Sequence, residues 1–587
     1  MEEEKKIELQ EKEKMYRHSM SHILAKAIKE LYPNVKVAIG PAIENGFYYD
    51  FDNLTINQED FAKIETKMSE IIARNEDFKR LEVSKEQALK MFKDEPYKTE
   101  LINELPAGET ISVYYTGEDF YDLCRGPHVE NTKFLRGFSF KINRVSGAYW
   151  RGSEKNKMLT RVYVYGFLNK DDLKECLRLE QEAKERDHRK LGKDLGIFMT
   201  SDLVGRGLPM WLPKGFILRR TLSDYIMNKE ISLGYQHVMT PSLGNVNLYK
   251  TSGHWDHYKE DMFPAMELDE EAYVLRPMNC PHHMVMFKNF QHSYRDLPIR
   301  IAEIANDFRY EASGNLIGLE RTRAFTQNDC HIFCRKDQIK QEVEGVINLI
   351  LDVYKAFGFK NYKFRLSLRD PKNVEKYFGN DDLWVESETA LREILKNSGA
   401  EYYEAEGEAA FYGPKIDVQV ISALGHDITL STVQLDYQLP EKFELEYIDE
   451  NSNKVRPVVI HRAVFGSLDR TVAFILEETK GNLPVWLSPV QVKILTVSEK
   501  NTEYANKVAL DLKTKNVRVD LDISNESVGK KIRSAVLEKT PYILVLGDKE
   551  QTDNTVAVRT RGSKDTVTLS YAEFEKELLQ AIENRSL

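Results

Sequence analysis

The pattern of apolar and polar residues divides the chain into three regions with different predicted secondary structure. Up to about Leu168, helical and strand-like stretches are mixed, beginning with one predicted helix over residues 1–32. From about Gly196 to Trp486, strand-like runs separated by turns dominate, a pattern typical of a large antiparallel sheet. The last hundred residues alternate strand and helix, which predicts a small α/β domain.

A densely charged stretch separates the first of these regions from the second. It runs from Asp171 to about Lys193, and its scattered apolar residues predict one helix that crosses a domain boundary. We therefore predict a multidomain α+β and α/β protein. Its expected parts are an α+β domain over 1–170, a helical linker over 171–195, an antiparallel-sheet domain over 196–486 and an α/β domain over 487–587.

Composition narrows the class of protein. With 587 residues, 42% hydrophobic and 30% charged, the chain is a water-soluble globular protein with several cores. It has no apolar run of membrane-spanning length and no secretory signal, so we expect a cytosolic protein. The net charge of -10 does not by itself indicate a nucleic-acid binder, although whole-chain charge averages over domains. The cysteines are odd in number and sparse, which favours free thiols or metal ligands over disulfides: Cys124, Cys176, Cys280, Cys330 and Cys334.

The central segment contains a predicted hairpin, RIAEIANDFRYEASGNLIGLERTRAFTQNDCHIFC. In its second strand, alternation places one set of side chains on one face: Arg323, Phe325, Gln327, Asp329 and His331. Cys330, Ile332 and Cys334 share the other face, and we favour buried core positions for the two cysteines over metal ligation. Several polar groups on one face are unfavourable in a core, so the first face predicts a ligand site.

Three motifs in this segment point to a known family. MTPSL contains Pro241, DFRYE contains Arg309 and Glu311, and GSLDR contains Arg470. In these motifs the chain resembles the class II aminoacyl-tRNA synthetases, and the threonyl-tRNA synthetase family in particular. The resemblance implies a homodimer whose MTPSL motif lies at the subunit interface. It also implies that the class II sheet domain stands between an editing domain and a C-terminal α/β anticodon-binding domain.

The resemblance implies ATP-dependent ligation of L-threonine to threonine tRNA through threonyl-adenylate. Adenylate formation displaces pyrophosphate, so negative charge must be held by permanent cations. By resemblance, Arg309 holds the α-phosphate, Glu311 lies near the adenine and Arg470 contacts the far end of the nucleotide. Mg²⁺ is expected to bridge the phosphates.

The resemblance also implies a zinc site made by Cys280 in RPMNCPHH, His331, and His461 in VVIHRAV. Two nitrogens and one sulfur suit Zn²⁺, and three protein ligands leave positions open for substrate. Threonine would then be selected over valine through its hydroxyl group. Serine lacks only a methyl group, which is worth roughly 1 to 3 kcal/mol, so some serine should be activated.

Other residues of the central segment match family positions that contact the amino acid or the adenylate: Gln327, Asp329, Tyr412, Gln434 and Ser467. Asp329 would take the amino group. His254 in SGHWDHY matches a residue used at the terminal ribose during transfer, and an ordinary loop histidine is the alternative. Thr429 stands where the family pattern has glutamine, so one nucleotide contact is expected to differ.

Two residue pairs in the first domain predict a second site. His18 and His22 are four residues apart on the predicted helix, and Cys124 and His128 are four apart in CRGPH. From the residues alone, a zinc site is the first interpretation. The resemblance instead implies an editing site that hydrolyses mischarged seryl-tRNA without metal, with Lys98 and Asp122 as further members and Tyr49 lining the pocket.

An editing site would complete the selection of threonine, because a coarse first site and a second site that accepts only the smaller product form a double sieve. In one respect the chain departs from the family pattern. Members usually begin with a small β-rich domain before the editing domain, and this sequence has no room for one.

The last domain resembles the anticodon-binding domain of several class II synthetases. Asn525, Glu550 and Arg559 match positions that read or orient anticodon bases, as polar side chains do in single-stranded RNA loops. Lys539 stands where arginine is expected, which would weaken one contact because lysine lacks the planar fork. Lys530, Lys531 and Arg561 are expected to be phosphate contacts or plain surface charges.

Two alternative functions remain open from the sequence. One is a related synthetase of the same class, for example for proline or serine. The other is a synthetase-like RNA-binding or regulatory protein without catalysis. Arg309, Arg470 and the three predicted zinc ligands argue against the second, since a non-catalytic relative needs none of them.

Overall fold

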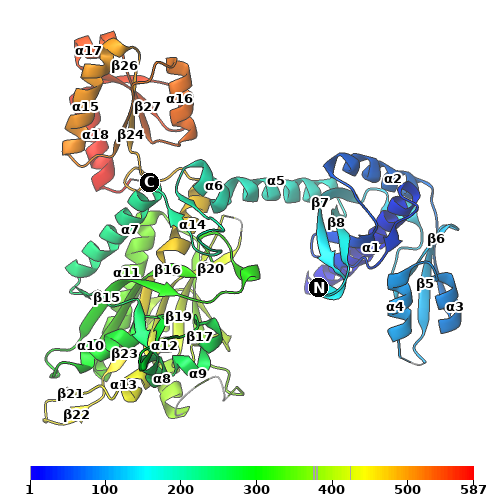
Figure 1. Ribbon diagram of the computed structural model, residues 1–587, viewed down its shortest axis with the longest axis horizontal. Helices are drawn as coiled ribbons and strands as arrows, with labels where there is room; N and C mark the ends of the chain where they lie inside the picture. The colour runs from blue at the N-terminus through cyan, green and yellow to red at the C-terminus, as the bar shows by residue number, and fades with distance from the viewer. Residues whose placement is uncertain (1, 107, 374–376, 378–380, 424, 587) are drawn as a thin grey trace. The chain divides into compact units, whose positions relative to one another are not determined.

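The computed structural model describes residues 2–106, 108–373, 377, 381–423 and 425–586. The chain forms two compact units, Met1–Gln181 and Glu182–Leu587. The boundary falls inside helix α5 (Lys170–Arg186), so one continuous helix belongs to both units (Figure 1).

The first unit is built on the predicted N-terminal helix, which the structure confirms as α1 (Glu2–Leu31). Its apolar side packs on α2 (Phe61–Ala73) and on a sheet ordered β1-β3-β8-β7, in which β2 also pairs with β3. The strands of this sheet are β1 (Lys36–Val37), β2 (Ala42–Ile43), β3 (Gly46–Asp52), β7 (Ser139–Tyr149) and β8 (Met158–Phe167).

A smaller antiparallel sheet, β4-β5-β6, completes the first unit with its own apolar cluster. It consists of β4 (Phe78–Val83), β5 (Ile111–Thr116) and β6 (Phe120–Leu123), with α3 (Lys85–Met91) and α4 (Pro96–Glu104) packed together beside it. Short 3-10 turns lie at η1 (Gln58–Asp60), η2 (Thr132–Leu135) and η3 (Trp150–Gly152). The predicted α+β class of this region is confirmed.

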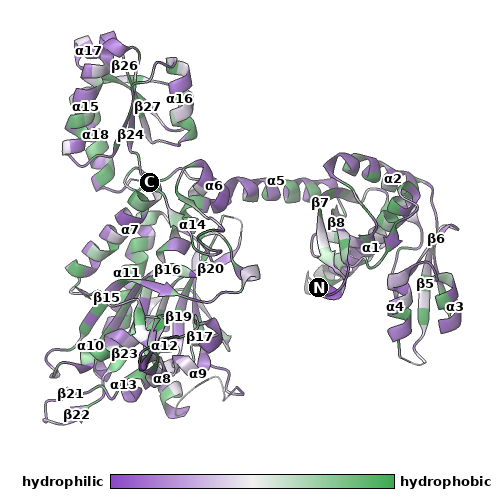
Figure 2. Ribbon diagram, viewed as in Figure 1, coloured by the Kyte–Doolittle hydropathy of each residue, from purple (hydrophilic) through white to green (hydrophobic). Residues whose placement is uncertain are grey.

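The charged linker is two helices rather than the single helix predicted. Hydrophilic residues predominate along α5, and none of its described side chains is buried (Figure 2). Asp187 then leaves the helical conformation, and its carboxylate accepts a hydrogen bond from the Arg189 backbone N–H, which starts α6 (His188–Asp194). An N-cap of this kind begins a new helix, and the charge pattern alone could not separate it from a continuous one.

The second unit is dominated by the predicted large sheet, ordered β11-β15-β16-β23-β20-β19-β17-β18. The interior pairs are antiparallel, while β11 with β15 and β17 with β18 are parallel at the two edges. Its strands are β11 (Gln236–His237), β15 (Ile299–Phe308), β16 (Ala324–Cys334), β17 (Tyr362–Leu368), β18 (Tyr402–Glu406), β19 (Lys415–Ile421), β20 (Asp427–Asp436) and β23 (Val458–Ser467).

One face of this sheet forms the main hydrophobic core. Cys330, Ile332 and Cys334 of β16 point into it, as the alternation predicted, and the cysteines are fully buried. The helices that cover this face are α7 (Pro213–Ser232), α11 (Ile339–Phe357), α12 (Asp381–Ser398) and α14 (Leu468–Thr479). The opposite face therefore remains for polar residues.

Shorter elements surround the opposite face. They are β12 (Leu243–Asn245), α8 (Val246–Ser252), α9 (His254–His257), β13 (Met266–Leu268), β14 (Glu271–Leu275), α10 (Cys280–Lys288), α13 (Gln438–Lys442), β21 (Tyr447–Ile448) and β22 (Lys454–Val455), with the 3-10 turn η4 (Lys259–Asp261). The remaining short elements are β9 (Phe198–Met199) and β10 (Met210–Trp211), whose Phe198 and Trp211 pack with the main core, and the 3-10 turns η5 (Ser313–Asn315) and η6 (Lys336–Gln338). Helix α10 packs on this face through Cys280, Met284 and Phe287, against Phe333 and Val459 of the sheet.

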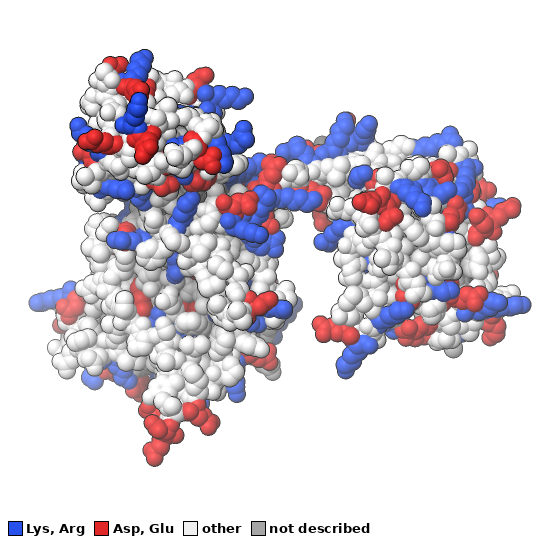
Figure 3. Space-filling model, turned by 45° about the horizontal axis from the view of Figure 1, so that its top comes forward, with Lys and Arg blue, Asp and Glu red and all other residues white. Residues whose placement is uncertain are grey.

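The predicted C-terminal α/β domain is confirmed as a sheet ordered β25-β24-β26-β27-β28 with helices packed on it. Its elements are β24 (Val492–Thr496), η7 (Glu499–Asn501), α15 (Thr502–Thr514), β25 (Val519–Asp522), α16 (Val528–Leu537), β26 (Tyr542–Leu546), α17 (Asp548–Asp553), β27 (Thr555–Thr560), β28 (Val567–Ser570) and α18 (Tyr571–Glu583). Both signs of charge are interspersed on the face that Figure 3 shows, in keeping with a modest net charge.

Helix α6 is fastened to the sheet domain through the buried ring of His188. Its Nδ1 lies 2.7 Å from Glu477 Oε1 of α14, and its Nε2 accepts a 3.0 Å hydrogen bond from the Leu319 backbone N–H. The ring passes so close to Gly318 that any larger side chain there would collide with it. The linker thus holds both α14 and the loop that connects β15 to β16.

Candidate active site and a second polar pocket

A cavity of about 280 Å³ opens on the polar face of the large sheet. Its walls come from the loop between β15 and β16, from β16, β19, β20 and β23, and from the start of α14. We call it the arginine cavity. Six predicted site residues line it: Arg309, Glu311, Gln327, Gln434, Ser467 and Arg470.

The contacts of Arg309 and Arg470 are with aromatic rings and backbone carbonyls, which do not neutralise their positive charge. The Arg309 guanidinium lies 5.0 Å from the Phe325 ring, and its buried Nε has no hydrogen-bond partner among the described residues. Burial and the nearby charge of Arg309 lower the pKa of Arg470, whose Nε donates to the Glu320 carbonyl at 3.2 Å. Cations in this condition are stabilised by an anion, and a phosphate group would supply one.

Local capping fixes Arg470. The Ser467 hydroxyl accepts a 3.0 Å hydrogen bond from the Arg470 backbone N–H and so caps the N-terminus of α14. The departure at Thr429 also falls in this cavity, where its hydroxyl lies 3.1 Å from the side-chain amide of Gln419. The threonine side chain is shorter than the glutamine of the family pattern, and its hydroxyl already has Gln419 as a partner.

The predicted zinc ligands converge beyond the cavity. Cys280 begins α10, while His331 of β16 and His461 of β23 face each other in register. One ligand atom from each lies within 4.8 Å of the others, and the two imidazole rings are 4.6 Å apart. All three side chains are buried. We call these residues the Cys280 cluster.

The donor set of the Cys280 cluster fits a metal ion. Buried Nε2 of His331 has no hydrogen-bond partner within the described part of the chain. His461 Nε2 lies 2.9 Å from Asp436 Oδ2, which leaves Nδ1 as its lone-pair nitrogen. Burial raises the pKa of the Cys280 thiol well above its usual value, so a thiolate here requires a bound cation. One sulfur and two nitrogens are the ligand chemistry of zinc.

Two predicted residues connect the Cys280 cluster to the arginine cavity. The Tyr412 hydroxyl donates to Gln434 Oε1 at 2.6 Å, and the Tyr412 ring lies 5.1 Å from that of His461. Asp329 Oδ2 lies 3.8 Å from His331 Nε2. Burial and the neighbouring carboxylate of Asp307 raise the pKa of Asp329 well above its usual value, so a ligand cation such as an amino group would stabilise its ionised form.

His254 lies at the start of α9 and is fully buried. Its Nδ1 lies 2.8 Å from the Ser252 hydroxyl, which itself donates to the Tyr249 carbonyl, so Nδ1 is the protonated nitrogen. Burial, together with the charge of nearby cationic groups, lowers the pKa of His254 to about 3. His254 Nε2 therefore carries a lone pair at neutral pH and lies 3.8 Å from Cys280 Sγ. This histidine belongs to the wall of the site.

In the first unit, the two predicted pairs form one pocket, which we call the Cys124 pocket: His18, His22, Cys124 and His128. Cys124 Sγ lies 3.2 Å from His18 Nε2 and 3.1 Å from His128 Nε2. Helix α1 supplies the first two histidines, and the loop after β6 supplies the cysteine and the third histidine.

Hydrogen bonds define the protonation state of this pocket. The Ser19 hydroxyl donates to the Met15 carbonyl and so accepts from His128 Nδ1, which leaves the lone pair of His128 Nε2 facing Cys124 Sγ. Burial raises the pKa of Cys124 to about 12 and lowers the pKa of His128. At neutral pH the pocket therefore holds a thiol between neutral imidazoles.

Lys98 and Asp122 form a buried ion pair beside the Cys124 pocket. The Tyr49 hydroxyl donates to Asp122 Oδ2 at 2.5 Å and accepts from Lys98 Nζ at 3.1 Å. His22 Nε2 lies 3.8 Å from the same carboxylate. All six predicted residues of the first-domain site, with Tyr49, thus occupy one neighbourhood.

The predicted anticodon residues lie on separate elements. Asn525 is exposed between β25 and α16, Arg559 lies on β27, and Glu550 Oε2 accepts from the Gly547 backbone N–H at the start of α17. Lys539 is directed elsewhere, since its ammonium group donates to the Lys480 carbonyl in the segment that precedes the domain.

One expectation for the basic residues of the last domain is wrong. Lys531 is buried, and its Nζ donates to the Thr496 carbonyl at 3.0 Å and the Asp522 carbonyl at 3.3 Å, so it is a structural residue. Arg561 donates to the carbonyls of Lys539 and Asn482. Arg561 remains partly exposed, so its expected phosphate contact stays a prediction, and Lys530 is exposed as expected.

Several residues of the site escaped sequence reasoning. Glu320, Arg321, Lys415 and Asp417 line the arginine cavity. Behind the Cys280 cluster lie Asp436, His283 and Glu303. The doubled histidine in RPMNCPHH was a usable signal for His283, because a buried histidine next to a predicted ligand needs its own partners.

A third group, Asp187, His188 and Glu477, has metal-ligand spacing. Both ring nitrogens of His188 already have protein partners, so the contacts explain this group without a metal. Among the helices that the structure describes, none is long and apolar enough to cross a bilayer.

Family models match three regions of the chain. The model for the "tRNA synthetase class II core domain (G, H, P, S and T)" matches residues 261–479. An "anticodon binding domain" matches residues 491–581, and the "threonyl and alanyl tRNA synthetase second additional domain" matches residues 111–163.

Relatives match over nearly the whole chain. A threonine–tRNA ligase from a Geobacillus species is 56% identical over 562 residues, which is 95% of this chain and 87% of the relative. The corresponding ligase from Anoxybacillus flavithermus is 54% identical and covers 96% of this chain and 88% of its own.

Solved structures match in fold as well. The RNA binding domain of threonyl-tRNA synthetase from Cryptosporidium parvum has a TM-score of 0.65 at 40% identity, covering 67% of this chain and 98% of its own. A putative threonyl-tRNA synthetase from Aeropyrum pernix has a TM-score of 0.61 at 26% identity, covering 68% of this chain and 97% of its own.

Proposed function

The chain belongs to the threonine–tRNA ligases, and we propose that it joins L-threonine to threonine tRNA in two steps, threonyl-adenylate formation and transfer to the terminal adenosine. The observation that carries this proposal is the juxtaposition of the Cys280 cluster with the arginine cavity. An amino-acid site and a phosphate site that share a wall through Tyr412 and Gln434 suit adenylate formation.

The arginine cavity would bind ATP with its Mg²⁺. Arg309 would hold the α-phosphate, because its guanidinium has an unpartnered donor and is stacked between aromatic rings. Arg470, fixed by the Ser467 cap, would contact the far end of the nucleotide, and Glu311 would lie near the adenine. Charge held by these groups would stabilise the pyrophosphate as it leaves.

The Cys280 cluster would hold one Zn²⁺ through Cys280, His331 and His461, and the bound ion supplies open positions for the amino and hydroxyl groups of threonine. Asp329 would accept the amino group, and Gln327 lies on the same face of β16. Valine should be rejected because it leaves the hydroxyl position unpaired, while serine should leak through. His254, with its lone pair on Nε2, would act at the terminal ribose.

Exchange of pyrophosphate into ATP, measured with threonine, serine, valine and proline, tests this proposal directly. We expect strong exchange with threonine, weaker exchange with serine and almost none with valine or proline, and loss of the threonine and serine activities after zinc is removed. Exchange with proline in place of threonine would support the related-synthetase alternative. No exchange with any amino acid would support the non-catalytic one.

The Cys124 pocket would hydrolyse mischarged seryl-tRNA. Neutral His18 and His128 offer proton acceptors beside a thiol, and the Lys98–Asp122 pair with Tyr49 adds fixed charge and hydrogen bonds at the same place. We favour hydrolysis without metal, because Cys124 is satisfied as a neutral thiol. Zinc bound by His18, His22, Cys124 and His128 is the alternative, and metal analysis of the Cys280→Ala variant would detect it.

The last domain would bind the anticodon through Asn525, Glu550 and Arg559. The same proposal includes the domain limits 1–170, 171–195, 196–486 and 487–587. It also includes a homodimer formed through the segment around Pro241, and a cytoplasmic location. To test anticodon binding, we expect Asn525→Ala to lower kcat/KM for tRNA without changing pyrophosphate exchange. The homodimer is tested separately, by sedimentation analysis of the full chain.

A further inference from the structure

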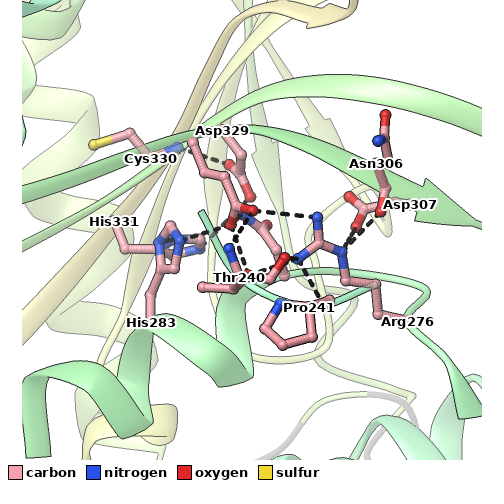
Figure 4. Close-up of polar contacts among 11 residues, drawn as sticks. Thr240, Pro241, Arg276, His283, Asn306, Asp307, Asp329, Cys330 and His331 are labelled. Atoms are coloured by element: carbon pink, nitrogen blue, oxygen red, sulfur yellow. Dashed lines mark hydrogen bonds and ion pairs between the residues drawn. The ribbon is translucent and has the colours of Figure 1, made fainter. Parts of the chain in front are cut away.

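Behind the Cys280 cluster, three side chains form a directed chain of hydrogen bonds. Glu303 Oε2 lies 3.1 Å from His283 Nε2, and His283 Nδ1 lies 2.8 Å from His331 Nδ1 (Figure 4). We call Glu303, His283 and His331 the Glu303 relay. All three side chains are buried, and they come from β15, α10 and β16.

The Glu303 end of the relay accepts hydrogen bonds. Burial would raise the pKa of Glu303, but hydrogen bonds from His283 and Thr240 and the charge of Arg276 lower it to about 2. The carboxylate takes donors on both oxygens, namely the Thr240 backbone N–H and hydroxyl at 2.9 Å each, Asn279 Nδ2 at 3.2 Å and Arg276 Nη2 at 3.3 Å. An oxygen pair surrounded in this way has no proton to give.

The direction of the remaining bonds follows from this acceptor. His283 Nε2 must donate to Glu303, so His283 Nδ1 carries a lone pair. His331 Nδ1 must then donate to His283 Nδ1, which leaves the lone pair of His331 on Nε2. Nε2 is the nitrogen of His331 that has no partner among the described residues and that faces the Cys280 cluster.

We propose that His283 and Glu303 are positioning residues for the metal ligand His331, and that they hold its ring in the tautomer and orientation that binds zinc. This inference rests on the zinc site proposed above. A carboxylate that acts through an imidazole also increases the basicity of the ligand, which strengthens the metal bond. The chain here has two imidazoles in series.

The relay extends to the segment around Pro241. Thr240 directly precedes Pro241, and Arg276 Nη1 donates to the Thr240 hydroxyl at 2.6 Å and the Pro241 carbonyl at 3.2 Å. Arg276 is itself buried, with Nε 3.1 Å from Asp307 Oδ1 two residues before Arg309. Figure 4 shows Thr240, Pro241, Arg276 and Asp307 linked by polar contacts in one network. The orientation of His331 thus depends on the position of the MTPSL segment.

His283→Phe removes the acceptor for His331 Nδ1 and keeps a ring of similar shape. His283→Gln restores an amide acceptor. The matched control is His282→Phe, in the same helix, whose side chain lies toward Tyr249, with ring centroids 6.4 Å apart. Zinc affinity is measured on the full chain by competition with a chromophoric chelator, and folding is measured by thermal unfolding without metal.

We expect His283→Phe to fold and to bind zinc about 10- to 100-fold more weakly, with His283→Gln between it and the wild type and His282→Phe unchanged. Cobalt substituted into the His283→Phe variant should also show an altered ligand-field spectrum. The relay proposal fails if folded His283→Phe keeps wild-type zinc affinity, or if His282→Phe loses as much. A wild-type chain that retains no zinc would instead refute the metal site itself.

Discussion

The Tyr412 hydroxyl donates a 2.6 Å hydrogen bond to Gln434 Oε1, and this bond joins the wall of the Cys280 cluster to the wall of the arginine cavity. In the function proposed above, amino-acid recognition and nucleotide binding would share this hydrogen bond, which we call the strut. Its removal should disturb the relative placement of the two substrates more than the binding of either.

Tyr412→Phe tests this strut. Loss of the bond leaves the Gln434 carbonyl unsatisfied, at about 1–3 kcal/mol, so threonine-dependent pyrophosphate exchange should fall roughly fivefold to 100-fold. Tyr437→Phe is the control, since the buried Tyr437 hydroxyl has no hydrogen-bond partner in the described part of the chain. Equal exchange rates for the two variants would show that the strut does not contribute.

Two buried cysteines have different predicted roles, Cys280 at the start of α10 as a metal ligand and Cys330 of β16 as a core residue. Cys280→Ala should lose the zinc of the catalytic domain and threonine activation together. Cys330→Ala, on the core face, should keep both and lose only about 1 kcal/mol of unfolding free energy. Metal content and denaturant unfolding measure the two effects, and zinc loss in Cys330→Ala would contradict the assignment.

Cys124→Ala should separate editing from synthesis. Hydrolysis of seryl-tRNA should slow by about 100-fold or more because a proton-transfer partner of His18 and His128 is removed, while threonine activation stays unchanged. Cys176→Ala, in α5 and outside the pocket, is the control. Hydrolysis at the wild-type rate in Cys124→Ala would exclude the thiol from editing.

The raised pKa of Cys124 predicts how its alkylation depends on pH. With a pKa of about 12, the thiolate is about one part in 10,000 at pH 8, so alkylation should be slow and rise about tenfold per pH unit between pH 7 and 10. Peptide mass analysis of a Cys176→Ser chain follows Cys124, since the other cysteines are buried. A plateau near pH 7 would instead indicate a thiolate held by a protonated histidine or a metal.

Periodic sequence patterns predicted side-chain positions correctly in elements that have one buried face. Alternation along β16 separated Cys330 and Cys334 from His331, because a strand with one apolar face has only one acceptable orientation. Spacing of four on α1 also placed His18 and His22 side by side. The roles of these residues remain predictions.

Contacts between distant elements could not be predicted in the same way. The Glu303 relay joins β15, α10 and β16, and no local pattern marks Glu303 as a partner of His283. Lys531 failed for the opposite reason. Its charge predicted exposure, yet carbonyls at the ends of two strands satisfy its ammonium group inside the domain.

The His188 contact sets a rule for recombining this protein with its relatives. Because that ring is hydrogen-bonded to both Glu477 and Leu319, α6 belongs to the sheet domain. A chimera joined after α6 would place the α6 of a relative against the Glu477 side chain and the β15–β16 loop of this chain. A crossover inside α5, near the boundary at Gln181, would transplant the N-terminal unit while leaving those bonds intact. Exchange of the N-terminal unit with that of a relative should therefore succeed with a crossover inside α5 and fail with a crossover after α6.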